Sequence, residues 1–262
     1  MITSDILQNR IKNFWGYGKL DASTWFIGME ERIDKFDFAQ EDKEGESILE
    51  KQFIYAEKVQ DENGMINVDR TNENEWGYLA NMSPFLHDQK TIQPTWRYPI
   101  ALYLYLESEI TKILNNEETK KAVLKHQVDI LSDGVKKKTA TLELSSLPNP
   151  SIKAKDWLPL YTREGFLSRE DYLPKRAKEL KKLIQEHQPQ RVIFYGLQYK
   201  SFWEVAIGAE LKMETPRMYF IKSKHTLFYL IPQGRGMSFG GRGCYERLYE
   251  FAKKIKDQIS TF

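Results

Sequence analysis

The chain has one cysteine, four histidines and no long apolar run, and each of these shortages excludes a class of protein. Cys244 alone cannot form an intrachain disulfide or hold an iron–sulfur cluster, and it fits a reducing, cytoplasmic setting. The histidines lack the spacing of a metal site. The longest apolar run, Ile100 to Leu106, is too short to cross a bilayer, and the N-terminus does not read as a signal peptide. We therefore expect a soluble protein with no cofactor, no metal and no membrane partner.

Three common catalytic classes find little support in the sequence. No Gly-Lys-Ser or Gly-Lys-Thr occurs, which excludes a Walker loop. Ser238 lies in a glycine-rich loop, Gly236-Met237-Ser238-Phe239-Gly240, without the strand-to-helix elbow that a serine hydrolase needs. The short motif Gly16-Tyr17-Gly18 precedes the first predicted strand instead of following it. A dinucleotide-binding motif needs the opposite order, so this class is disfavoured as well.

Negative charge is concentrated in one segment. Between Glu30 and Glu75 there are fifteen acidic and six basic side chains, although the whole chain has a net charge of +2. The remainder is therefore basic, as in proteins that bind a polyanion, unless these charges are simply scattered over a solvated surface. The length suits one domain over residues 1–262, and we interpret residues 32–75 as an acidic insertion into it.

Apolar runs and apolar stripes alternate along the chain, which predicts strands separated by helices. The predicted strands are 24–28, 139–147 and 191–196, followed by a hairpin of 218–221 and 226–231. The predicted helices are 4–15, 47–60, 99–114, 117–131, 168–187, 199–207 and 244–259. This order indicates an α/β fold with three layers, in which helices cover both faces of a mostly parallel, four-stranded sheet.

The first predicted strand ends in the most informative motif of the chain. Trp25-Phe26-Ile27 is suited to a buried strand, and Gly28 lets the backbone turn at its carboxyl end. Met29, Glu30 and Glu31 follow directly. Ligands of open α/β sheets bind at this edge, so two carboxylates there are placed for chemistry. The alternative is a strand followed by a solvated acidic loop.

Other segments lead to the same edge. Asn149 and Ser151 follow the second predicted strand, and Gln233 follows the last one. The loop after Gln233 is rich in glycine and arginine, so its backbone could approach a phosphate while the arginines neutralise it. Its expected DNA-binding residues are Gly234, Arg235, Gly236, Ser238 and Arg242. Farther upstream, Phe85 could stack on a nucleobase. A flexible surface loop and core packing are the respective alternatives.

These strand ends resemble the motifs of the uracil-DNA glycosylase superfamily. The resemblance rests, in chain order, on residues 25–31, 144–151, 192–196 and 230–236. It implies a glycosylase-like α/β/α fold and hydrolysis of the N-glycosidic bond of a base flipped out of DNA, which leaves an abasic site. It further implies Glu30, or else Glu31, as the acid that activates water. Gly28, Met29, Phe85, Asn149 and Ser151 would then bind substrate.

The chain departs from that family in one motif. Uracil-specific members carry a His-Pro-Ser type motif where this chain has Pro232-Gln233-Gly234-Arg235. Gln233 could donate a neutral hydrogen bond to the leaving base, and Arg235 could offset its charge. Some relatives act in anti-phage defence on heavily modified pyrimidines, and the acidic insertion offers carboxylates for sugar hydroxyls. We therefore expect a modified pyrimidine as the substrate, for example glucosylated hydroxymethylcytosine in phage DNA.

Other functions remain open at this stage. They are a uracil-DNA glycosylase, a hydrolase of nucleosides or nucleotides, and a non-catalytic module that binds nucleic acid. A metal site at Glu30 and Glu31 is the least favoured, because it needs a further Asp or His that the motif does not supply. The expected partner is DNA, and the expected state is a cytoplasmic monomer.

Overall fold

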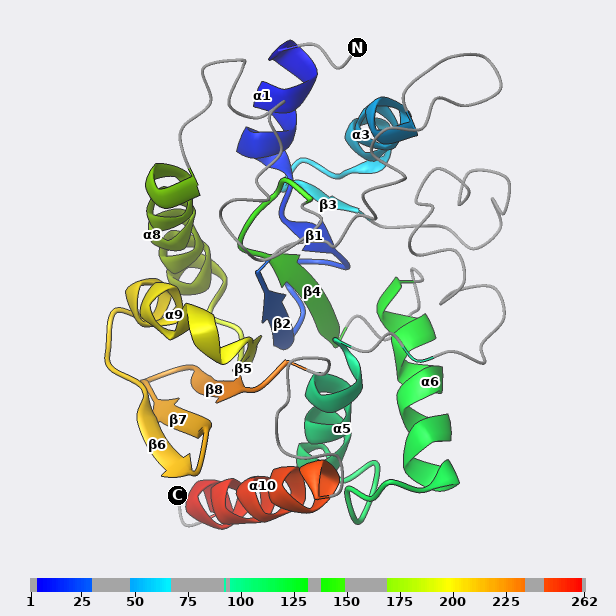
Figure 1. Cartoon of the computed structure of the whole chain (residues 1–262), viewed down its shortest axis with the longest axis vertical. Coiled ribbons are helices and arrows are strands. Elements are labelled where there is room, and N and C mark those ends of the chain that lie inside the picture. The colour runs from blue at the N-terminus through cyan, green and yellow to red at the C-terminus, as the bar shows by residue number, and fades with distance from the viewer. Residues whose placement is uncertain are drawn as a thin grey trace.

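The computed structural model describes residues 4–29, 48–66, 92, 95–131, 138–148, 169–233 and 243–260. Within them the fold is α/β, with seven α-helices and one mixed, eight-stranded sheet (Figure 1). The helices are α1 (Ser4–Asn13), α3 (Ile48–Val59), α5 (Arg97–Leu106), α6 (Glu117–Leu131), α8 (Arg169–His187), α9 (Lys200–Ile207) and α10 (Cys244–Ser260), and the 3₁₀-helix η3 (Leu197–Tyr199) precedes α9. The strands are β1 (Gly16–Tyr17), β2 (Thr24–Gly28), β3 (Met65–Ile66), β4 (Thr139–Glu143), β5 (Arg191–Tyr195), β6 (Lys212–Thr215), β7 (Met218–Lys222) and β8 (Leu227–Ile231).

Four neighbouring strands at the centre of the sheet run parallel. The order across the sheet is β3-β1-β4-β2-β5-β8-β7-β6, and the pairs β4–β2, β2–β5 and β5–β8 are all parallel. Trp25, Phe26 and Ile27 of β2 are each at most 1% exposed, so β2 is covered on both faces. A continuous apolar run suits such a strand, because both of its faces pack against helices.

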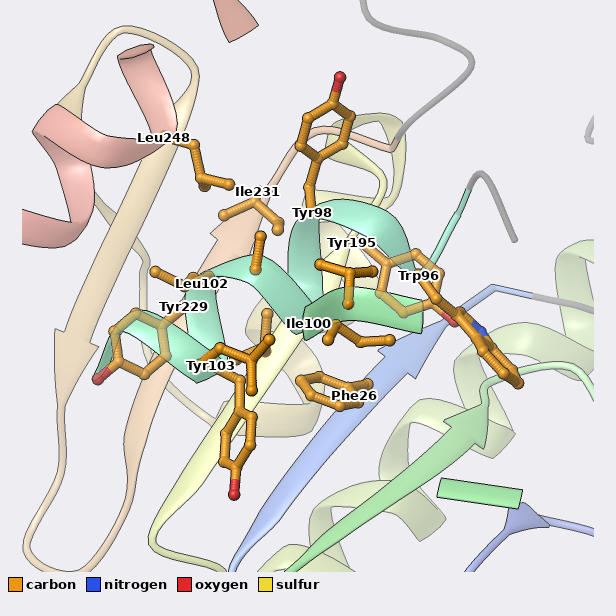
Figure 2. Close-up of a cluster of buried hydrophobic side chains, with 14 of the residues drawn as sticks. Phe26, Trp96, Tyr98, Ile100, Leu102, Tyr103, Tyr195, Tyr229, Ile231 and Leu248 are labelled. Carbon is orange, nitrogen blue, oxygen red and sulfur yellow. The ribbon is translucent and has the colours of Figure 1, made fainter. Parts of the chain in front are cut away.

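Helices lie on both faces of these central strands. Successive side chains of a strand point to opposite faces. Phe26 and Tyr229 accordingly belong to a buried cluster with α5 and α10, whereas Trp25 and Phe228 belong to a second cluster with α8 and α9. Figure 1 shows α8 and α9 on one side of the strands and α5 and α6 on the other. Figure 2 shows the first cluster, arranged around α5.

The expected four-stranded sheet is wrong in strand number, because the sheet has eight strands, of which β1, β3 and β6 were not predicted at all. The antiparallel hairpin of β7 and β8 was predicted, and β7 pairs with β8 as expected. Strands β1 and β3 contain two residues each, too few to show a periodic pattern. Strand β6, Lys212-Met213-Glu214-Thr215, is polar and largely exposed at the sheet edge, so no apolar run indicates it.

Helix α5 ends at Leu106, earlier than the apolar pattern predicts. Ser108 adopts a left-handed φ of 62°, and the Glu109 amide donates to the Leu104 carbonyl while the Ser108 amide donates to the Tyr105 carbonyl. This pair of hydrogen bonds is a Schellman motif, which closes the helix end. The apolar residues Ile110 and Ile113 are buried after the helix has ended.

Part of the predicted acidic insertion joins the edge of the main sheet. Within residues 32–75 the described elements are α3 and β3, and β3 pairs in parallel with β1. The segments 30–47 and 67–75 lie outside the described residues. Among the helices that the structure describes, none has the length and apolar character needed to span a bilayer.

Candidate functional site

The carboxyl ends of β4, β2, β5 and β8 lie along one edge of the sheet, because these four strands are parallel. The register places Gly28 of β2 beside Glu143 of β4, and Ile27 beside Phe194 of β5. Tyr195, the last residue of β5, therefore also reaches this edge. Open α/β sheets bind their ligands outside the carboxyl ends of their strands. We take this edge as the candidate site.

Gly28 makes room for the side chain of Tyr195. A Cβ atom at position 28 would lie 2.4 Å from the Tyr195 hydroxyl oxygen and 2.5 Å from ring carbon Cζ. No other residue type fits without displacing the tyrosine, since real Cβ atoms do not approach heavy atoms this closely. The sequence predicts a backbone turn at this glycine, whereas in the structure Gly28 is the last residue of β2 and its missing side chain is what matters.

A buried carboxylate lies beside Gly28. Glu143 is 6% exposed, and its register position places it on the same face as Gly28. The Tyr195 hydroxyl donates a hydrogen bond to Glu143 Oε1 at 3.4 Å, and the Glu143 amide donates to the Trp15 carbonyl at 2.8 Å. Removing a carboxylate from water is costly, so a buried one at a sheet edge is a strong candidate for function.

Two buried aromatic side chains lie near this end of the sheet. Tyr195 is 4% exposed and Trp96 is 3% exposed, and both belong to the cluster around α5. Figure 2 shows Trp96 and Tyr195 at the same end of that cluster. Trp96 immediately precedes α5, so this helix begins near the candidate site. Tyr195, which also binds Glu143, brings one aromatic ring of this cluster to the edge.

The backbone after β2 is fixed by the backbone after β4. The Leu144 amide donates to the Gly28 carbonyl at 2.9 Å, and the Ser145 amide donates to the Met29 carbonyl at 2.6 Å. The Met29 side chain is 5% exposed and packs in the apolar cluster on the α8 side of the sheet. The chain is thus held in place up to the residue that precedes Glu30.

Three buried side chains bind the segment that follows β4. Arg10 Nε donates to the Ser146 carbonyl at 2.9 Å, and Arg176 Nε donates to the Leu144 carbonyl at 3.1 Å. The Ser146 amide donates to the Tyr172 hydroxyl at 3.1 Å, and the two hydroxyl groups of this pair lie 2.6 Å apart. We call Arg10, Tyr172 and Arg176 the clamp. It fixes the strand end from which Asn149 and Ser151 continue.

One of the two guanidinium groups of the clamp, that of Arg176, is almost fully buried. Arg176 is 1% exposed, and burial lowers the pKa of its guanidinium below the usual value. Its Nη2 donates to the Phe14 carbonyl at 2.8 Å, and its Cζ lies 3.4 Å from the centre of the Trp15 ring. Backbone carbonyls, an aromatic face and an ion pair with the exposed Glu179 carboxylate at 3.6 Å compensate this buried charge.

The structure brings together only some of the residues predicted from the sequence. Gly28 and Met29 lie at the edge, and Gln233 is half-buried two positions after β8, with β5 between β8 and β2. The other predicted residues lie outside the described residues: Glu30, Glu31, Phe85, Asn149, Ser151, Gly234, Arg235, Gly236, Ser238 and Arg242. Their roles stay predictions.

The sequence prediction did not include Glu143 and Tyr195 among the site residues. One signal was available, because Glu143 is the only charged residue in the predicted strand 139–147. A carboxylate within an otherwise uncharged buried strand costs free energy and therefore calls for a functional reason. Tyr195 had no such signal, since a tyrosine in an apolar strand is ordinary core material.

No metal site is evident in the described part of the chain, where no group of three or more His, Cys, Asp or Glu side chains could hold an ion. Comparison of the sequence with protein-family models found no match, and comparison with curated proteins found no significant match. The geometry of the carboxyl edge therefore carries the functional proposal.

Proposed function

We propose that this protein is a DNA glycosylase with a uracil-DNA glycosylase-like fold, which removes a modified, cytosine-type pyrimidine and leaves an abasic site. The observation that carries the proposal is the buried Glu143 beside Gly28 and Tyr195, at the carboxyl edge of parallel strands. The resemblance of four strand-end motifs supplies the reaction class. The parallel order of β4, β2, β5 and β8 supports it, since it directs all four motifs to one edge.

In the proposed reaction the bond between C1′ of the sugar and N1 of the base breaks, and water attacks C1′. The sugar gains positive charge while the base leaves with negative charge, so a carboxylate near the sugar stabilises the transition state and orients the water. We assign this role to Glu30, which follows the fixed Met29 backbone. Gln233 and Arg235 would stabilise the departing base through a neutral and a charged hydrogen bond.

Glu143 supplies a reason for specificity. An ionised carboxylate only accepts hydrogen bonds, and cytosine presents an amino group at C4 where uracil presents a carbonyl oxygen. A carboxylate therefore attracts a cytosine-type edge and repels a uracil edge. The amino group lies across the ring from N1, so a carboxylate that binds it is farther from the glycosidic nitrogen than a partner at C2 would be. The Tyr195 hydroxyl would hold the carboxylate in position.

Base release from synthetic DNA tests the proposal. Oligonucleotides that contain cytosine, hydroxymethylcytosine, its glucosylated form or uracil are incubated with the protein, and abasic sites are detected by alkaline cleavage. We expect release of the modified cytosine, and we expect Glu30→Gln to abolish it. Equal release from every substrate, or full activity of Glu30→Gln, would contradict the assignment.

The variant Glu143→Gln tests the specificity argument separately. An amide can donate to the uracil carbonyl, so preference should shift from cytosine-type bases toward uracil by about 10- to 100-fold, the worth of one good base contact. Glu117→Gln is the matched control, because its side chain is 76% exposed on α6. An unchanged preference in Glu143→Gln would show that this carboxylate does not contact the base.

A further inference from the structure

A second cavity lies away from Gly28, Glu143 and Tyr195. It is a cleft of about 540 Å³ between α1 and α8, a size that accommodates a small organic ligand. Both helices contribute charged and polar side chains to it, and the buried Tyr172 and Arg176 form its floor. The remaining lining residues are Asp5, Gln8, Asn9, Ile11, Lys12, Lys175 and Glu179.

The floor of the cleft holds a guanidinium nitrogen that makes no hydrogen bond. Arg176 donates hydrogen bonds from Nε to the Leu144 carbonyl and from Nη2 to the Phe14 carbonyl. Its Nη1 is buried and forms an ion pair with Glu179 Oε2 at 3.6 Å, which is too long for a hydrogen bond, and it makes no hydrogen bond among the described residues. Buried donors without a hydrogen bond are rare in folded proteins. The Glu179 side chain is 54% exposed, so it can rotate and open Nη1 to the cleft.

The charges around the cleft point to one class of ligand. Lys12 and Lys175 are exposed on the two walls, and with Arg176 they surround the cleft with three cations. We propose that this cleft binds a phosphorylated sugar. The phosphate lies between these three cations, and the sugar hydroxyls donate to the carboxylates of Asp5 and Glu179. An inorganic phosphate would use only the cations, and a neutral sugar only the carboxylates.

Binding in this cleft is connected to the candidate site through the clamp. Arg176 and Tyr172 each line the cleft with one part of the side chain and bind the segment after β4 with another. A phosphate on Nη1 orders the guanidinium, and the guanidinium in turn restrains the Leu144 carbonyl. The ligand therefore stabilises the strand end beside Gly28. This connection does not depend on which reaction the site performs.

Isothermal titration of the full chain with ribose 5-phosphate, inorganic phosphate and ribose tests the proposal. Ribose 5-phosphate should bind at least about tenfold more tightly than either fragment, because only it engages both sets of groups. The double variant Lys12→Ala, Lys175→Ala should weaken binding by about tenfold or more. Lys182→Ala is the matched control, since it removes an exposed lysine of α8 that does not line the cleft.

Three results would overturn the site or its ligand class. Absence of binding overturns the site. Equal affinity for ribose 5-phosphate and inorganic phosphate overturns the sugar phosphate assignment. An equal loss in the Lys182→Ala control assigns the binding to diffuse surface charge. Competition by duplex DNA would identify the sugar phosphate as part of a nucleic-acid backbone, and lack of competition would identify it as a free metabolite.

Amide hydrogen exchange tests the connection to the strand end. Saturating ribose 5-phosphate should slow exchange of the Leu144 and Ser145 amides, which donate to the end of β2. Exchange in β7, which is separated from β4 by β2, β5 and β8, serves as the internal control. Binding without slower exchange at Leu144 and Ser145 would leave the ligand site standing and overturn the connection.

Discussion

Lowering the pH should destabilise the folded chain through His126. This residue lies in α6, with its ring centre 4.8 Å from the Tyr103 ring centre and its Nε2 3.2 Å from Thr139 Oγ1. Burial, helped by the positive charge of Lys138, lowers the pKa of His126 from 6.5 to about 4. The folded protein therefore keeps this ring neutral at a pH where the unfolded chain is already protonated.

The sign and size of the effect follow from this difference. Above pH 6.5 both states are neutral, so His126 adds no pH dependence. Between pH 6.5 and about 4 only the unfolded state binds the proton, so the free energy of unfolding falls as the pH falls. At pH 4 the free energy of unfolding is lower by about 2 to 3 kcal/mol than at neutral pH. The lower value allows for solvent screening of the exposed part of the ring.

Urea denaturation at several pH values between 7 and 4 measures this loss. Carboxylates also titrate in this range, so the wild type is compared with His126→Gln, in which only the histidine contribution disappears. The variant should lose about 2 to 3 kcal/mol less than the wild type between pH 7 and 4. His225→Gln, at an exposed position before β8, controls for removal of a histidine in general. Parallel curves for the wild type and His126→Gln would refute the reasoning, as would an NMR titration of His126 near pH 6.5.

Three further predictions concern packing at the candidate site and the hydrogen bonds of the clamp. Gly28→Ala places a methyl group 2.4 Å from the Tyr195 hydroxyl and should lower the free energy of unfolding by about 1–3 kcal/mol in urea. Combining it with Tyr195→Ala should cost less than the sum of the two single changes, and strict additivity would argue against the contact. Tyr172→Phe removes the hydroxyl that binds Ser146 and should cost about 1–2 kcal/mol. Arg176→Met leaves the Leu144 and Phe14 carbonyls without this donor, so the free energy of unfolding should fall by about 3 kcal/mol or more, and the thermal midpoint should fall with it. Wild-type stability of Tyr172→Phe or Arg176→Met would contradict the role of the clamp.

Much of the secondary structure is predictable because single segments carry the necessary pattern. The apolar runs at 24–28 and 191–195 predict strands, and both are parallel strands buried on their two faces. The apolar stripe of 168–187 predicts a helix, and α8 extends from Arg169 to His187. The apolar pattern within each of these segments fits one type of element only, so it identifies the element without knowledge of the packing partner.

Elements whose stability comes from distant partners are not visible in the sequence. Strand β1 forms by pairing with β4 and β3, and β3 forms by pairing with β1. Each has only two residues, which show no periodicity. Strand β4 ends at Glu143, before the predicted Leu147, where Ser145 and the clamp bind the following backbone. Only the partners of that segment decide where the strand stops.

The amino-acid pattern alone predicts an α/β chain with a glycine at the end of its first long strand and polar motifs after several strands. Which groups meet at that edge depends on how the strands assemble. Tyr195 and Glu143 are 52 positions apart, and they touch only because the parallel register places both beside Gly28. Register is a property of the assembled sheet and depends on the pairing of whole strands. No local pattern therefore predicts the contact between Tyr195 and Glu143, although Gly28, which leaves room for the Tyr195 side chain, stands in the first predicted strand.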